Sequence, residues 1–164
     1  MLLNVDEQLT PADHHTHRRY TFTVPPRATR LDIHLRYAPK ALPEDESMHL
    51  ATRALWSQAA ALAPCVGQPE ADAWAVAQRQ RRWSRVRNLL TVSVDDADGV
   101  YRGACHRQPH EQHMTIERTE ATPGLVPGGL MPGEWRLTLS AHTLASAQCA
   151  VEIQIAAETA SRRP

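Results

Sequence analysis

The stretch that decides the fold is Leu31-Asp32-Ile33-His34-Leu35-Arg36-Tyr37, in which apolar and polar residues alternate without a break. Successive side chains of a β-strand point to opposite faces, so the apolar residues of this stretch share one face. The polar residues Asp32, His34 and Arg36 share the other face, where we expect them to meet solvent. The stretch is therefore predicted to be a half-buried strand.

The same alternation recurs toward both ends of the chain. It appears in residues 20–24, 90–94, 134–140 and 149–155, and more briefly in 114–118. Turn residues at 95–99 and a proline- and glycine-rich loop at 122–133 separate these segments. Strands that come first and last, without regular alternation with helices, favour a mainly β fold. We predict a jelly-roll-like antiparallel β-sandwich.

The middle of the chain has a helical period instead. Apolar residues lie three or four positions apart from about Ser47 to Leu62, with Ser47 as the expected N-cap, and again from Glu70 to about Arg87. The segment 64–69 contains two prolines and a glycine and is expected to be the turn between two helices. The prediction is a two-helix hairpin inserted into the sandwich at about residues 45–88.

Bulk composition narrows the class of protein. The 164 residues suit one domain, expected at 14–156, with flexible tails at 1–13 and 157–164. Eighteen Lys and Arg balance eighteen Asp and Glu, which argues against nucleic acid or an anionic membrane as a partner. No export signal or membrane span is visible, and Cys65, Cys105 and Cys149 fit no disulfide framework. We expect a soluble, cytoplasmic protein with free thiols.

Four blocks of sequence resemble a known domain. They are YTFTVPPRATRLDIHLRY at 20–37, NLLTVSVDDADGVYRGACHR at 88–107, EATPGLVPGGLMPGEWRLTLSAH at 120–142 and CAVEIQI at 149–155. Together they resemble the N-terminal β-sandwich domain of CehA/McbA-like PHP-type metallohydrolases. In that family a metal-binding PHP barrel follows the sandwich and supplies the catalytic ligands. The resemblance therefore implies a fold and a PHP-type partner, but it assigns no catalytic residue to this sequence.

Two histidine clusters raise the question of a metal site. Asp13-His14-His15-Thr16-His17 is similar to the entrance of a PHP site, and His15 and His17 would point to one side of an extended chain. His106, His110 and His113, with Glu111, form a second cluster in and after a proline-containing loop. We interpret the first cluster as a solvated strand start and the second as exposed loop histidines. No resident metal or cofactor is expected at either.

Three further residues are candidates for a binding surface. Arg82 and Trp83 lie in an arginine-rich part of the second predicted helix, which is interpreted as a solvated face or a docking surface. Trp135 is expected to point inward, although an exposed Trp135 beside the proline-rich loop would form a ligand groove. Cys105 and His106 are chain neighbours on a strand and would face opposite ways, which disfavours a nucleophile–base pair.

These observations lead to one functional hypothesis and two alternatives. The first is a non-catalytic accessory module that acts by protein binding or assembly. Its partner would be a PHP-type hydrolase on a separate chain, or a second copy bound through the helical hairpin. One alternative is a small metal-dependent hydrolase that uses a histidine cluster, and the other is a carbohydrate- or peptide-binding module.

Overall fold

The computed structural model describes residues 1–80, 85–105 and 109–160, and the chain divides into two compact units. The first unit comprises Met1–Lys40 and Asn88–Pro164, and the second comprises Ala41–Arg87. The first unit contains the strands and the second contains the two long helices. The predicted helical insertion between strands is therefore confirmed.

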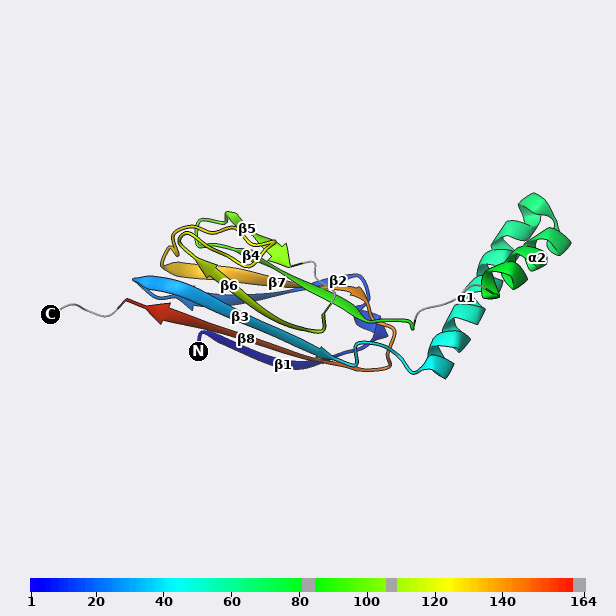
Figure 1. The fold of residues 1–164 in the computed structure, drawn as a ribbon, viewed down its shortest axis with the longest axis horizontal. Helices are drawn as coiled ribbons and strands as arrows, with labels where there is room; N and C mark the ends of the chain where they lie inside the picture. Colours follow the sequence, from blue (N-terminus) through cyan, green and yellow to red (C-terminus); the bar gives the residue numbers. More distant parts are fainter. Residues whose placement is uncertain (81–84, 106–108, 161–164) are drawn as a thin grey trace. The chain divides into compact units, whose positions relative to one another are not determined.

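Two four-stranded sheets make up the first unit (Figure 1). One has the order β1 (Leu3–Leu9), β8 (Cys149–Thr159), β3 (Ala28–Ala38) and β6 (Glu111–Glu117). The other has the order β2 (Thr16–Val24), β7 (Gly133–Thr143), β4 (Leu89–Asp95) and β5 (Tyr101–Cys105). A short 3₁₀ turn, Pro11–Asp13, joins β1 to β2.

The strand pairing is nested, as in a long hairpin that has been rolled up. The first strand, β1, pairs with the last, β8. Moving inward along the chain, β2 pairs with β7, β3 with β6 and β4 with β5, and all four pairs are antiparallel. The rolled hairpin places alternate pairs in opposite sheets, which is the arrangement of a jelly roll. The predicted mainly β, jelly-roll-like sandwich is confirmed.

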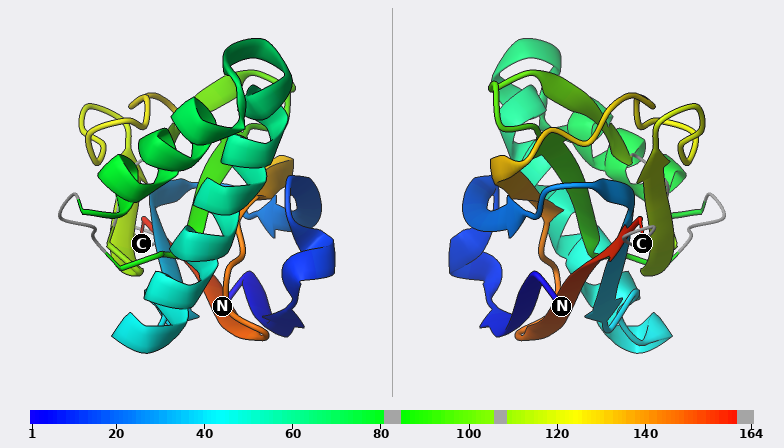
Figure 2. Two further views of the ribbon diagram at one scale, coloured as in Figure 1. Left: turned by 90° about the vertical axis from the view of Figure 1, so that its right-hand side faces the viewer. Right: turned by 90° about the vertical axis from the view of Figure 1, so that its left-hand side faces the viewer.

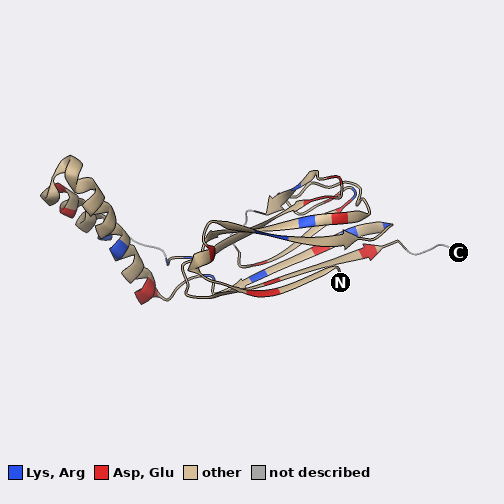
Figure 3. Cartoon of the chain, turned by 180° about the vertical axis from the view of Figure 1, so that it is seen from behind, with Lys and Arg blue, Asp and Glu red and all other residues tan. Residues whose placement is uncertain are grey.

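The core lies between the two sheets and follows the period-two pattern. Leu31, Ile33, Leu35 and Tyr37 of β3 are at most 1% exposed, as their alternation predicts. The facing sheet contributes Val92, Val94, Trp135, Leu137 and Leu139 to the same buried cluster. Acidic and basic positions are interspersed along the strands (Figure 3). The sandwich therefore has an apolar interior between outer faces that carry polar and charged residues.

The expected flexible tails at 1–13 and 157–164 are wrong where the structure describes them. Residues 3–9 form β1, which pairs with β8 along its whole length, and Leu9 is 1% exposed. Strand β8 continues to Thr159, beyond the strand end predicted at 155 and the domain end predicted at 156. Polar and apolar residues are equally numerous in the segment 1–13, which has no long apolar run, yet residues 3–9 form the edge strand of a sheet.

The helical unit is a hairpin of α1 (Glu44–Val66) and α2 (Gln68–Arg79), which lie side by side (Figure 2). Its turn is Gly67, which adopts a φ of 94°, a conformation that glycine tolerates best. The predicted turn at 64–69 is therefore too long, because α1 continues through Pro64 and Pro69 lies in the first turn of α2. Proline at that position costs little, because the backbone N–H groups of the first turn have no hydrogen-bond acceptor within the helix.

Two predicted helix boundaries also differ from the structure. Ser47 is not the N-cap: α1 begins at Glu44, and buried Ser47 accepts a hydrogen bond from the backbone N–H of Val86 at 3.1 Å. The second helix ends at Arg79, well before the predicted Arg87, which instead forms an isolated β-bridge with Ala41. In the described part of the chain, neither helix is long and apolar enough to cross a membrane.

Small side chains form the contact between the two helices. Ala59, Ala71 and Ala75 are at most 2% exposed and pack with Ala63 and Trp74. Larger apolar side chains of the hairpin remain between 36% and 51% exposed: Met48, Leu50, Trp56, Leu62, Val66 and Val76. The hairpin thus buries its alanines and presents much of its larger apolar surface to solvent.

Candidate functional site

The first histidine cluster lies at the start of β2 and is held by local contacts. The Nδ1 atom of His14 accepts a hydrogen bond from the backbone N–H of Leu144 at 3.2 Å. His15 has a φ of 58°, so the chain turns there and the period-two argument for His15 and His17 does not apply. His17 Nδ1 lies 2.9 Å from the hydroxyl oxygen of Ser140. Within residues 1–80, 85–105 and 109–160, these histidines do not meet a carboxylate as a group of metal ligands.

The second cluster is divided by the fold. His106 lies outside the described residues. His110 precedes β6, and its ring meets the edge of the Tyr37 ring at a centroid distance of 6.4 Å. His113 belongs to β6 and pairs across the sheet with His34 of β3. The predicted partnership of His113 with His110 is therefore replaced by a partnership with His34.

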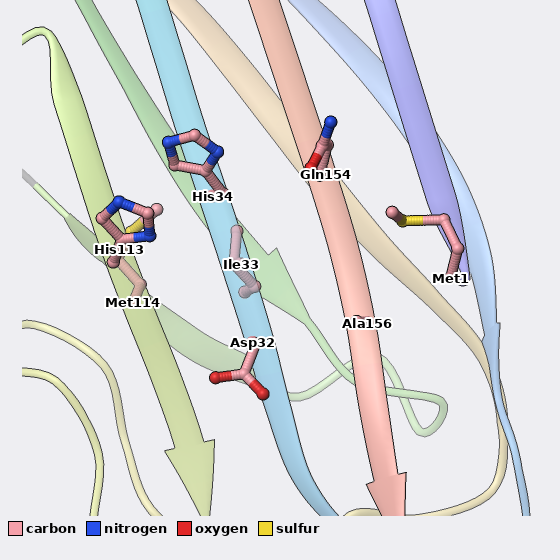
Figure 4. A pocket seen from close by; sticks show the side chains of 8 residues that line it. All are labelled: Met1, Asp32, Ile33, His34, His113, Met114, Gln154 and Ala156. Carbon is pink, nitrogen blue, oxygen red and sulfur yellow. The ribbon is translucent and has the colours of Figure 1, made fainter.

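His34 and His113 lie side by side on neighbouring strands (Figure 4). Their imidazole rings are stacked, with centroids 4.2 Å apart and planes only 5° from parallel. Direct cross-strand neighbours on one face of an antiparallel sheet come this close because their Cβ atoms are about 4.5–5.5 Å apart. The pairing register is therefore sufficient to explain the stack.

Glu111 completes the group from the same face of β6. It precedes His113 by two residues, so both side chains point outward from the sheet. Its Oε1 atom lies 3.4 Å from Nε2 of His34 and 3.8 Å from Nε2 of His113. Among the described residues, this is the group of histidine and carboxylate side chains whose ligand atoms all lie within 4.8 Å of one another.

The three side chains differ in exposure. The His34 side chain is 25% exposed, Glu111 is 50% exposed and His113 is 74% exposed. The Nε2 atom of His34 is buried and has no hydrogen-bond partner among the described residues. Burying a ring nitrogen without a partner is unfavourable, so this atom is the chemically unsatisfied member of the group.

A shallow hollow of about 150 Å³ adjoins the two rings on the outer face of the sheet. Figure 4 shows the side chains of Met1, Asp32, Gln154 and Ala156 around it, together with His34 and His113. The small side chain of Ala156 leaves space between its longer neighbours. The hollow has room for a few water molecules or a small ion beside the imidazoles.

Trp135 does not form a ligand surface. Its side chain is fully buried, and its indole N–H donates to the carbonyl of Met131 at 2.8 Å. The predicted inward orientation is confirmed, whereas the alternative of an exposed groove at Trp135 is wrong. The other two surface candidates, Arg82 and Trp83, lie outside the described residues.

His34 is the member of the group that sequence reasoning left out. It occupies a polar position of the predicted strand 31–37, and His113 directly precedes the predicted strand 114–118. Both are therefore candidates for an outward-facing position of a strand, which is the signal that could have found the pair. Only the register of β3 against β6 brings them opposite each other, and that register joins distant parts of the chain. The alternation within one strand does not show which distant strand it pairs with.

Comparisons with known proteins add little about this group. No family model matches the chain, and neither does any curated protein. Among solved structures, the chain is similar to the crystal structure of a protein from Sulfurospirillum deleyianum. That similarity covers 98% of this chain and 99% of the other, with 7% sequence identity and a TM-score of 0.33. A similarity of this size carries no functional argument, so function must be inferred from the residues themselves.

Proposed function

We propose that the chain is a non-catalytic β-sandwich accessory module that acts by protein binding or assembly through its helical hairpin. The observation that carries the proposal is the exposure of large apolar side chains on that hairpin. Trp56 is 43% exposed and Val66 is 51% exposed, while the contact between the helices is made chiefly by alanines. We place the contact on these side chains because exposed apolar patches are typical of protein interaction sites.

Tryptophan adds weight to this interpretation. Aromatic side chains are enriched in the buried centres of protein interfaces, where a few of them supply most of the binding energy. Trp56 lies in the middle of α1, with Leu62 and Val66 further along the same helix. The partner surface would therefore be apolar, and either a second copy or another protein could supply it.

The sequence resemblance to the β-sandwich domain of PHP-type metallohydrolases suggests what a partner other than a second copy would be. We infer that a PHP-type hydrolase on a separate chain is the alternative partner to a second copy of this module. The sandwich would then support or position the enzyme without contributing to its chemistry. We also propose a cytoplasmic location, which the three free cysteines support because a reducing compartment keeps such thiols unpaired.

Light scattering on the purified full-length chain tests the assembly. We expect a dimer that the paired substitutions Trp56→Glu and Leu62→Glu convert to a monomer. Gln58→Glu is the matched control, because it adds a charge at an exposed position of the same helix and should leave the assembly intact. If the wild-type chain is monomeric, titration with a purified PHP-type hydrolase domain is the second arm. A monomer that binds no such domain would contradict the proposal.

A further inference from the structure

We propose that His34, Glu111 and His113 form a binding site for a divalent transition-metal ion, of which Zn²⁺ is the first to test. The inference concerns the outer face of the sandwich and does not depend on the proposed function of the hairpin. It assigns a ligand to the group of side chains that β3 and β6 bring together. No catalytic step is attached to it.

The donor set suits such an ion. Two imidazole nitrogens and one carboxylate oxygen are ligands that Zn²⁺, Ni²⁺ and Cu²⁺ accept, whereas Ca²⁺ and Mg²⁺ prefer oxygen alone. Three protein ligands leave a fourth position of a tetrahedral ion for water. The hollow that adjoins His34 and His113 lies on the same outer face of the sheet.

The distances are close to those of a formed site. In tetrahedral zinc sites with ligands about 2.0–2.1 Å from the metal, neighbouring ligand atoms lie about 3.3 Å apart. The pair formed by Glu111 Oε1 and His34 Nε2 is already at 3.4 Å. The distance between Glu111 Oε1 and His113 Nε2 is 3.8 Å and must shorten by a few tenths of an ångström.

One side-chain movement is required, and the exposure pattern permits it. A metal ion lies close to the plane of each imidazole that binds it, so two parallel rings must open toward each other. The His113 side chain is 74% exposed, so its ring has room to rotate. His34 is the more buried ring and would stay in place as the fixed ligand.

An ion would also add two favourable contacts within the group. The buried Nε2 atom of His34 would gain a partner, and the Glu111 carboxylate would gain a cation. Arg36, which faces Glu111 across the strands, forms its ion pair with Glu152 at 4.0 Å.

The experiment is an isothermal titration calorimetry measurement in which Zn²⁺ is added to tag-free, full-length protein. We expect one ion per chain, with at least tenfold weaker binding in His113→Ala and in His34→Gln. The double variant His15→Ala plus His17→Ala is the matched control: it removes two other exposed histidines and should change the affinity less than twofold. Circular dichroism of each metal-free variant checks that the fold is intact.

Two further readouts separate this site from binding elsewhere. Zn²⁺ should raise the unfolding midpoint of the wild-type chain but not that of His113→Ala, because only a native-state site links binding to stability. The absorption of a Co²⁺ complex should lack a thiolate charge-transfer band, which excludes Cys65 as a ligand. Affinity that survives His113→Ala, or that disappears in the His15 and His17 double variant, would overturn the proposal. If His34→Gln does not fold, the affinity of His113→Ala, a variant at an exposed position, still decides the outcome.

Discussion

The guanidinium group of Arg102 lies over the indole ring of Trp135, with its central carbon 5.1 Å from the ring centroid. Arg102 is buried, and it donates hydrogen bonds to the carbonyl oxygens of Val126 and Gly129 while pairing with Asp96 at 3.5 Å. One side chain therefore joins β5, β7, the turn after β4 and the proline-rich loop. The proline- and glycine-rich loop at 122–133 is thus held in place by a buried charge.

Replacing Arg102 by Met should therefore destabilise the sandwich strongly. Removing one partner of a buried, hydrogen-bonded ion pair costs about 3–5 kcal/mol, because the other charge is left buried without compensation. Here the carboxylate of Asp96 would keep the backbone N–H donors of Asp98 and Val100 but lose its cation, and two loop carbonyls would lose their donor. Urea unfolding followed by tryptophan fluorescence measures the loss. The control Arg136→Met, at an exposed position of β7, should change the free energy of unfolding by no more than about 0.5 kcal/mol. Similar losses in both variants would contradict the role assigned to Arg102.

The loop and β5 also approach each other too closely for any side chain. A Cβ atom at Gly103 would lie 2.2 Å from the carbonyl oxygen of Gly124, and Gly103 has a φ of 101°. Gly103→Ala should thus cost more than about 2 kcal/mol, from backbone strain and overpacking together. Gly129 in the same loop has nothing within 4 Å of an added Cβ atom. Thermal unfolding should show a large loss for Gly103→Ala and little change for Gly129→Ala; equal midpoints would show that the close approach does not exist.

The N-terminal strand gives a third prediction. Leu9 is 1% exposed and pairs with Cys149 of β8. Leu9→Ala should lower the free energy of unfolding by about 2–5 kcal/mol, the usual range for a buried leucine. Gln8→Ala, at the exposed neighbouring position, should leave it nearly unchanged. Equilibrium unfolding in urea distinguishes the two, and a negligible loss at Leu9 would mean that the first residues are a tail after all.

These examples show how far the sequence alone could lead. The period-two pattern was sufficient to predict which residues of β3 and β7 face the core, since alternation is a local property. The bounds of strand β5 were not predicted, because Arg102 and Gly103 interrupt its apolar pattern, and both are required by contacts with a loop more than twenty residues away. Strand β1 was missed because an edge strand with one solvated face contains few apolar residues.

The candidate metal site could be predicted only in part. Glu111 and His113 can be named from sequence because they lie close together in the chain. His34 was correctly placed on the polar face of its strand, but its position opposite His113 depends on the register between two distant strands. Sequence spacing is the only guide to proximity without a structure, and it points to near neighbours such as His106 and His110 instead.

An ion-pair network at the N-terminal edge predicts a dependence on pH. The backbone N–H of Thr10 and the guanidinium of Arg18 hold the pKa of Asp13 below its ordinary value of 3.8. The pKa is lower in the folded state, so the stabilisation from ionised Asp13 is complete above pH 3.8 and is lost as the pH falls through the folded-state pKa.

Urea unfolding of wild type and Asp13→Asn across this pH range tests the network. The wild type should be the more stable at pH 6, and its advantage should shrink toward pH 2. Arg18→Met should reduce the advantage without removing it, because the hydrogen bond from the Thr10 N–H remains. A difference between the two proteins that does not vary with pH would refute the assignment.

The three cysteines should differ sharply in reactivity. Burial raises the pKa of the Cys149 thiol to about 11, so only about a thousandth of it is thiolate at pH 8. Cys105 is 1% exposed, whereas Cys65 is exposed on α1. A thiol reagent such as Ellman's should therefore modify one thiol quickly in the native protein and all three in urea. Cys65→Ser should abolish the fast reaction while leaving two thiols to appear on unfolding. A second fast thiol in the native protein would mean that the interior between the sheets opens readily to solvent, which the packing around Cys149 argues against.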